Sequence, residues 1–226
     1  MRIFYCMETL SKTWHPLELL WLIVACSAAL ITCHIGNDCT IQSIISTLSG
    51  IIFVILCAKG KWYGFFFGII HCLLYGLISY KQTLYGEAFL KMCYAIPMHI
   101  SGLFLWHRST SRRTFEVIHR NLTPWGKFIT AFIILAFTYG LGSVLKMWGD
   151  EVPYVDAFTT VASIHAAVLM IRRYAEQWDL FIIINIMSVY MWVDRYIETG
   201  DNLGTLVMWI IWTINSIYGY FKWNKT

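Results

Sequence analysis

Three residues in the stretch AEQWDLFIIINIMSV, residues 175–189, have side chains suited to hold a flat organic molecule. Trp178, Phe181 and Asn185 follow one another at spacings of three and four, so on a helix all three share one face. Aromatic rings stack on planar heterocycles, and a Trp face attracts a delocalised cation with about 0.5–2 kcal/mol. An amide bonds hydroxyls or a carboxamide. The trio therefore predicts a site for a planar heterocycle.

Other polar residues interrupt apolar segments, where an unpaired polar group costs several kcal/mol and needs a partner or a water-filled space. His71 and Asn185 are expected at equivalent depths of two related segments. His99 and Asn215 lie in the second halves of two later segments. These four side chains are the leading candidates for hydrogen bonds to a bound molecule.

Small residues precede His71 at helical spacing. Gly64 and Gly68 lie on the face of His71, as Trp178 and Phe181 lie on the face of Asn185. If the two faces meet, small residues stand opposite large rings, and a slot about one aromatic ring thick remains between them.

Each candidate also has a purely structural interpretation, and both are kept open. An isolated Trp such as Trp178 is common in the belt where a membrane meets water. Asn185 and Asn215 could instead join neighbouring helices, a contact worth about 0.6 kcal/mol in membranes. A His bonded to the next helix is equally ordinary, which applies to His71 and His99.

Two further features in residues 86–106 favour structural interpretations. Glu87 and Lys91 are four residues apart, which predicts an ion pair within one helix. Pro97 lies inside the same apolar segment and predicts a kink.

The composition identifies the elements that must position these residues. The chain has 226 residues, of which 58% are hydrophobic and only 13% charged, whereas soluble domains carry about 25% charged residues. Apolar runs long enough to cross a bilayer as helices, roughly 20 residues, recur along the chain. We therefore expect an all-α polytopic membrane protein, with spans at about 17–36, 41–58, 62–80, 86–106, 127–146, 154–172, 177–194 and 203–222.

The distribution of basic residues tests this count of spans. With eight crossings, thirteen of the 17 Lys and Arg fall on the side of the N-terminus, and Lys91 falls within a span. Only Lys81, Lys146 and Arg195 fall on the other side. The positive-inside rule then predicts that both termini are cytoplasmic.

The chain also repeats itself. Residues 64–106 and 178–223 each contain a polar residue seven positions in, a connector with Tyr and Gly, and a Gly four residues before a closing Trp. We predict two like-oriented three-helix repeats, a plan used by some transporters. The expected divisions are 1–40 (tail and first helix), 41–106 (first repeat), 107–153 (loop and linker helix) and 154–226 (second repeat and tail).

Several function classes lack their characteristic residues. The seven Cys form no CxxC pair, and no metal, cofactor or nucleic-acid site is indicated. No GxSxG, HExxH or phosphate-binding glycine loop suggests an enzyme. A coupled symporter would bury an acidic relay, so facilitated diffusion by a uniporter is the favoured hypothesis. The hypothesis of another class is a membrane sensor or assembly module that does not transport.

Three stretches carry a family resemblance: YGEAFLKMCYAIPMHISGLFLW, RRYAEQWDLFIIINIMSV and TLVMWIIWTINSIYGYFKW. They resemble the PnuC family of bacterial vitamin transporters, over roughly residues 14–223. The resemblance implies a protein of the bacterial inner membrane with a SWEET-like arrangement of three, one and three helices and an additional N-terminal helix, often as a homotrimer. It also implies facilitated diffusion of an unphosphorylated vitamin, most often nicotinamide riboside, which a separate cytoplasmic kinase then traps.

The sequence departs from the family pattern at several positions. Nicotinamide riboside carriers in this family typically show WxxWxxxN, of which Trp178 and Asn185 match whereas Phe181 replaces the second Trp. His71, Lys91 and His99 stand where the family has Asn or Gln. The expected substrate-binding residues are Trp178, Phe181, Asn185, His71, His99, Asn215, Lys91 and Tyr94. Thiamine or another nucleoside-like vitamin is the alternative substrate.

Overall fold

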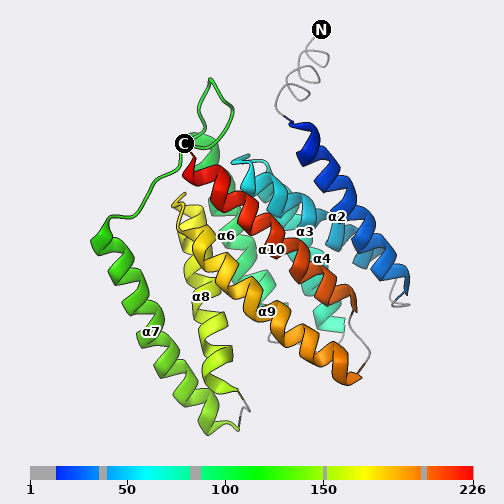
Figure 1. Cartoon of the computed structure of the whole chain (residues 1–226), viewed down its shortest axis with the longest axis vertical. Coiled ribbons are helices and arrows are strands. Elements are labelled where there is room, and N and C mark those ends of the chain that lie inside the picture. Colours follow the sequence, from blue (N-terminus) through cyan, green and yellow to red (C-terminus); the bar gives the residue numbers. More distant parts are fainter. Residues whose placement is uncertain (1–13, 36–39, 82–87, 150–151, 200–202, 226) are drawn as a thin grey trace.

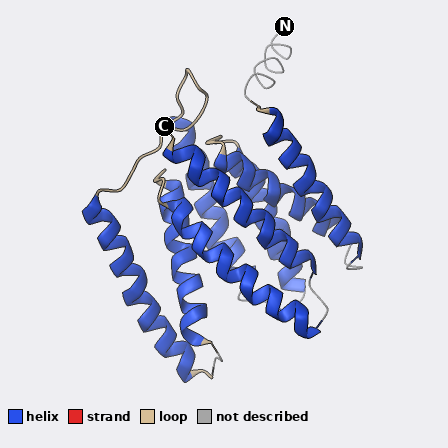
Figure 2. Ribbon diagram, in the orientation of Figure 1, coloured by secondary structure: helices blue, strands red, loops and turns tan. Residues whose placement is uncertain are grey.

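The computed structural model describes residues 14–35, 40–81, 88–149, 152–199 and 203–225. Every regular element in these ranges is a helix, and the helices pack as one bundle (Figures 1 and 2). In chain order they are α2 (Pro16–Ile35), α3 (Ile41–Ala58), α4 (Gly64–Lys81), the π-helix η1 (Leu90–Ala95), α6 (Ile96–Arg108), α7 (Pro124–Met147), α8 (Pro153–Ile171), α9 (Gln177–Thr199) and α10 (Leu203–Asn224). A helix stands at each expected span, so the all-α prediction is confirmed.

Length and composition single out four of the described helices as able to cross a membrane: α3, α4, α7 and α8. A shorter apolar stretch, Pro16–Thr32, lies in α2. The other long helices, α9 and α10, carry Asn, Trp and Tyr among their apolar residues, which lowers their mean hydropathy. Those polar and aromatic residues include the ones expected to bind a ligand.

Local sequence explains where several helices begin and end. Thr40 and Thr123 cap α3 and α7, because each side-chain oxygen accepts a hydrogen bond from a backbone N–H three residues later. Pro124 and Pro153 lie at the first turns of α7 and α8, where a missing N–H costs nothing. The wide turns of η1 end just before Pro97, whose missing N–H interrupts the regular helical pattern.

Helix packing groups six helices into two triplets. The first triplet is α3, α4 and η1–α6, and the second is α8, α9 and α10; within each, consecutive helices pack together. The first helix of each triplet packs on the last helix of the other, α3 on α10 and α8 on α6. Outside this arrangement, α7 packs on α8, whereas α2 packs on both α3 and α10 (Figure 1).

One end of the bundle, here named the basic end, carries Lys59, Lys61, Lys127, Arg172 and Lys222. At this end the first helix of each triplet stops at a residue with positive φ, Gly60 at 72° and Arg173 at 67°. Gly60 N–H donates to the Cys57 carbonyl as Arg173 N–H donates to that of Met170. The next two backbone hydrogen bonds recur as well. Lys61 N–H donates to the Leu56 carbonyl as Tyr174 N–H donates to that of Leu169, and Gly64 N–H donates to the Lys61 carbonyl as Gln177 N–H donates to that of Tyr174.

The segment of residues 109–123 joins these two turns. Val117 N–H donates to the Gly60 carbonyl and Arg120 N–H to the Arg173 carbonyl, each at 2.8 Å. Val117 is buried in the hydrophobic cluster at this end, with residues of both triplets such as Cys57 and Met170. The long polar link of the sequence is therefore part of the core of the basic end.

Candidate binding site

Trp178 lies in the first turn of α9 with 3% of its surface exposed. Its ring covers Gly219 of α10, where an added Cβ would stand 2.7 Å from the nearest ring atoms. The ring centroids of Phe181 and Trp223 lie 6.0 Å and 5.7 Å from that of Trp178. The indole Nε1 has no hydrogen-bond partner among the described residues. The side chain is thus enclosed by protein, with an unused donor.

Asn185, two turns further along α9, is also buried. Its Nδ2 donates to Ser216 Oγ of α10 at 3.0 Å, which joins two helices of the second triplet. The neighbouring Asn215 donates instead across to the first triplet, from Nδ2 to the Val54 carbonyl of α3 at 2.9 Å. Asn215 Oδ1 is buried without a partner in the described part of the chain. Both amides join helices, and one keeps an unused acceptor.

His71 of α4 lies against α3. Its Nδ1 is 2.9 Å from the Ser46 carbonyl, and the ring fills the space over Gly50. The other face stacks on Tyr75 at 5.6 Å between ring centroids. A carbonyl only accepts, so Nδ1 carries the proton, and in a neutral ring Nε2 is then an acceptor.

His99 of α6 shows the same pattern. Its Nδ1 donates to the Ala95 carbonyl one turn earlier at 2.6 Å. The ring packs over Gly68 of α4 and lies 4.6 Å from the Phe53 ring of α3. In a neutral ring Nε2 is again an acceptor, and no described hydrogen bond uses it.

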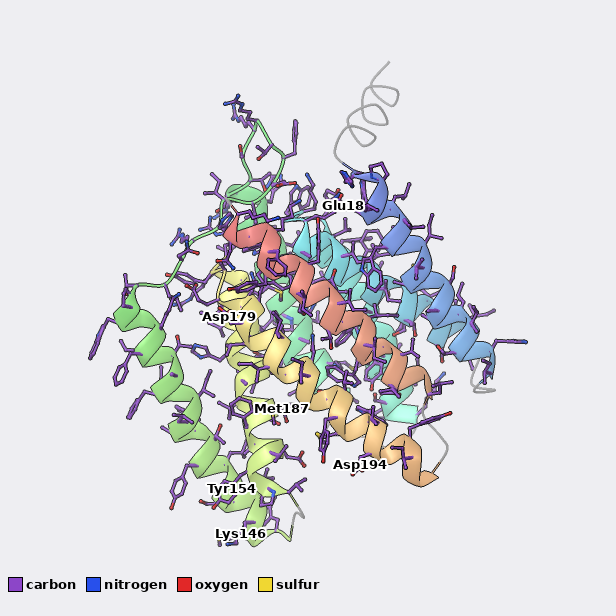
Figure 3. All side chains as sticks on the ribbon, viewed as in Figure 1. Glu18, Lys146, Tyr154, Asp179, Met187 and Asp194 are labelled. Carbon is purple, nitrogen blue, oxygen red and sulfur yellow. The ribbon has the colours of Figure 1, made fainter. Side chains whose placement is uncertain are left out.

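These residues share one depth. His71 and Asn185 lie seven and eight residues from the helix starts at the basic end, or ~10–12 Å at the rise of an α-helix. His99 and Asn215 each lie nine residues before their helix ends there, or ~14 Å. Asp179 and Met187, labelled in Figure 3, bracket that depth on α9. Together, His71, His99, Asn185 and Asn215 form the polar layer, contributed by four helices.

The polar layer and the aromatic pair Trp178–Phe181 occur in a chain that matches known transporters. A family model described as Nicotinamide mononucleotide transporter matches residues 40–225. A protein of Neisseria mucosa named Nicotinamide riboside transporter PnuC is 32% identical over 219 residues, covering 94% of this chain and 82% of that protein.

The chain belongs to the PnuC transporter family.

Further PnuC relatives agree. A protein of the same name from Haemophilus influenzae is 29% identical, covering 94% of this chain and 91% of its own length. A solved structure, described as the crystal structure of the vitamin B3 transporter PnuC, superimposes with a TM-score of 0.78 at 30% identity. That superposition covers 94% of this chain and 92% of the other. The agreement extends over nearly the whole helix bundle.

Lys91 and Tyr94, the remaining residues expected to bind substrate, lie on η1. Lys91 Nζ is 5.1 Å above the Tyr75 ring, and Tyr75 in turn stacks on His71. Tyr94 OH donates to the Ile164 carbonyl of α8 at 3.3 Å, between the triplets. Lys91 therefore adjoins the polar layer, whereas Tyr94 links helices. The ion pair expected between Glu87 and Lys91 involves a residue outside the described ranges.

The expected slot between glycines and rings is not formed as predicted. An added Cβ on Gly64 would meet Leu56, and one on Gly68 would meet His99, so neither glycine faces Trp178 or Phe181. The glycines instead let α4 approach its own neighbours α3 and α6. The glycine that the Trp178 ring does cover, Gly219, belongs to the same triplet as Trp178.

The correspondence between the triplets is also shifted by one residue. The shared turn bonds pair Gly64 with Gln177, and Phe65 covers Gly102 as Trp178 covers Gly219. Phe65, not Gly64, thus corresponds to Trp178, and Cys72, not His71, corresponds to Asn185. His71 and Asn185 share a depth but not an equivalent position.

Sequence reasoning missed two polar positions. Gln177 is fully buried beside Trp178, and neither atom of its amide has a partner among the described residues. Ser216, the partner of Asn185, lies in an ordinary apolar helix. In the sequence, Gln177 stands at the edge of a span, after the small Ala175 and the charged Glu176. Its spacing of four residues to Phe181 is the only sequence signal that connects it to the site.

Buried charges at the basic end tie the triplets together. Glu18 of α2 accepts hydrogen bonds from Lys59, after α3, and from Tyr218 of α10. Glu116 pairs with Lys61 at 3.5 Å and with Lys222 at 3.1 Å. Burial lowers the pKa of the Lys61 ammonium, and Glu116 opposes that shift.

A cavity of about 320 Å³ lies beside this network, between α2, α3 and α10. Its walls include Glu18, Trp21 and Ile214, and none of the four polar-layer side chains lines it. The cavity is therefore distinct from the candidate site.

Proposed function

We propose that this chain is a uniporter that carries an unphosphorylated vitamin with a planar heterocycle, most simply nicotinamide riboside, across the inner membrane by facilitated diffusion. The relatives named for that substrate support the class. The observation that carries the proposal is the placement of Trp178 and Phe181 one to two turns from Asn185, all on one face of α9.

Unused hydrogen-bonding groups support a ligand with both donors and acceptors. Trp178 Nε1 offers a donor and Asn215 Oδ1 an acceptor. His71 and His99 offer Nε2 acceptors at the same depth. A riboside presents a heterocycle to the rings and hydroxyl donors to the imidazoles.

The same groups favour a riboside over its phosphorylated form. A phosphate has acceptor oxygens and negative charge, which the Nε2 acceptors of His71 and His99 would repel. At the basic end, Lys59, Lys61 and Lys222 already pair with Glu18 and Glu116. The proposed substrate is accordingly the unphosphorylated compound, and a cytoplasmic kinase would trap it after entry.

The charge distribution supports the orientation. The basic end carries most of the Lys and Arg, and the positive-inside rule therefore predicts that this end faces the cytoplasm. The matched turn bonds at Gly60 and Arg173 support the division into two like-oriented repeats, 41–106 and 154–226. A homotrimer of such units is part of the proposal, and the exposed aromatic face of α7, with Trp125, Phe128 and Phe132, would be available for lipid or subunit contacts.

A second candidate substrate is thiamine or another nucleoside-like vitamin. Phe181 attracts a ring cation less than a Trp would, and the Lys91 ammonium adjoins the polar layer. Both features lessen the attraction for any ring cation, the thiazolium of thiamine included, so they favour an uncharged nucleoside-like vitamin over either cation.

Uptake of labelled nicotinamide riboside into proteoliposomes tests the proposal. Saturable uptake is expected without any ion gradient, and unlabelled substrate on the inside should accelerate exchange. A requirement for a proton or sodium gradient would refute the uniporter mechanism. If no tested vitamin or nucleoside binds, the protein is better explained as a sensor or assembly module.

A further inference from the structure

The side chain of Gln177 is buried without satisfying its amide. Its exposed fraction is 0%, and neither Nε2 nor Oε1 has a hydrogen-bond partner in the described residues. Leaving a buried polar group unpaired costs about 1–3 kcal/mol, and native proteins rarely accept this without a reason. An apolar residue of similar size would avoid the cost.

The backbone around Gln177 is held firmly in place. Gln177 N–H donates to the Tyr174 carbonyl at 3.3 Å, and Ala175 N–H donates to that of Arg120 at 2.8 Å. Glu176 accepts from Leu122 N–H at 3.0 Å. The segment of residues 109–123 thus contacts the start of α9, and these bonds hold the backbone of Gln177 at the basic end of the candidate site.

Helix geometry places Gln177 beside Phe181, one ring of the aromatic pair Trp178–Phe181. Phe181 lies four residues later, so the two side chains are neighbours along α9. Trp178 is the next residue, and its Nε1 also lacks a partner in the described chain. Gln177 and Trp178 therefore leave a side-chain amide and an indole N–H donor unpaired next to the Phe181 ring.

We infer that Gln177 binds the carboxamide of the substrate's ring and so selects a pyridine that carries one. A primary carboxamide has one acceptor oxygen and an NH₂ donor, as the Gln177 amide does, so the two can form paired hydrogen bonds. This inference rests on the proposed function, and it adds a specificity residue to the site.

Two ligands separate the effect of Gln177 from binding in general. Nicotinamide riboside carries the carboxamide, and ribosylpyridinium is the same cation without it. The dissociation constants of both are measured by calorimetry on the purified full-length protein. Wild type should bind nicotinamide riboside about tenfold more tightly, the fold-change of one or two hydrogen bonds to a buried group.

Gln177→Met removes the amide at similar volume. It should weaken nicotinamide riboside binding about tenfold and leave ribosylpyridinium within about twofold of wild type. The ligand-free protein should unfold at a higher temperature, because the unpaired amide is gone. Gln42→Met is the matched control: Gln42 is exposed at the start of α3, where it accepts from Lys81, and its replacement should change neither constant.

Three outcomes would overturn the inference. Wild type could bind both ligands equally, Gln177→Met could weaken both equally, or it could weaken neither. Failure of wild type to bind either ligand would instead refute the proposed function.

Discussion

Gly219 and Gly102 decide how closely large rings approach the last helix of each triplet. Trp178 covers Gly219, and Phe65 covers Gly102, and each glycine lies one turn before a buried Trp that also contacts the ring. The position of the Trp178 ring therefore depends on the absence of a side chain on α10.

Gly219→Ala should displace the Trp178 ring, since the added Cβ would stand 2.7 Å from it. We expect a loss of about 1–3 kcal/mol in stability and weaker substrate binding. Gly140→Ala on α7 is the control, because nothing lies within 4 Å of its Cβ position. Thermal unfolding and ligand titration of both variants check this; equal behaviour of the two would contradict it.

Trp178→Phe and Asn185→Ala test the site with small structural changes. The first keeps a ring but removes Nε1 and weakens the attraction for a ring cation, so nicotinamide riboside should bind about tenfold more weakly. The second removes one amide and should cost about threefold to tenfold. Ser216→Ala removes only the helix contact of Asn185 and should leave affinity nearly unchanged. Unaltered affinity in both site variants would rule out the assignment.

The sequence predicted four of the polar residues inside the bundle but not how they pair. Apolar context alone identified His71, His99, Asn185 and Asn215. The partners of His71 and Asn215 are backbone carbonyls of α3, and hydropathy carries no information on those. The matched bonds of the turns at Gly60 and Arg173 show that the pairing of Gly64 with Trp178 is wrong by one residue, and composition gives no information on such backbone bonds.

At the scale of helices, each triplet donates a tryptophan hydrogen bond to the other. Trp106 Nε1 at the end of α6 donates to the Met170 carbonyl of α8 at 2.9 Å. Trp223 Nε1 at the end of α10 donates to the Ala58 carbonyl of α3 at 3.0 Å. These two contacts close both junctions between the triplets at the basic end.

The two junctions differ in what else supports them. The α3–α10 junction also has the Asn215–Val54 bond and is covered by α2 through a hydrophobic cluster that includes Ala25, Ile51 and Ile211. At the α6–α8 junction the described structure shows the bond from Tyr94. The α6–α8 junction thus has fewer supporting contacts in the described chain.

Trp106→Phe and Trp223→Phe each remove one of these donors. Each should destabilise the protein by about 1–3 kcal/mol, because a buried side-chain hydrogen bond is lost and the smaller ring leaves unfilled space. Because its junction has fewer other contacts, Trp106→Phe should also raise hydrogen exchange in α6 and α8 more than Trp223→Phe raises it in α3 and α10. Hydrogen-exchange mass spectrometry measures this, and the opposite ranking would contradict it.

Helix positions were predictable because apolar runs separated by short polar links leave few choices in a bilayer. The π-helix before Pro97 was not, since a proline predicts an interruption but not its form. The role of residues 109–123 was also missed, because a polar sequence gives no sign that Val117 enters the core.

For the whole molecule, Glu18 connects α2 to both triplets. It bonds Lys59 next to α3 and Tyr218 on α10, and Lys59 is fully buried. These partners are far apart in sequence, so composition did not reveal the network.

Glu18→Gln should strongly destabilise the bundle, because it leaves Lys59 buried without this carboxylate; such losses cost about 3–5 kcal/mol. Glu18→Gln with Lys59→Met should recover much of that loss. Unfolding temperatures of the single and double variants check the prediction, and a double variant no more stable than Glu18→Gln would refute it.

Residues 112–115 are exposed, whereas Val117, just beyond them, is buried against the first triplet. If the chain were cut between Arg113 and Thr114, the C-terminal piece would therefore keep Val117, which packs against the N-terminal piece. The two pieces, made as separate polypeptides in one cell, should associate and purify together. Replacing Val117 with Asp should weaken that reconstitution, although the α3–α10 and α6–α8 contacts remain.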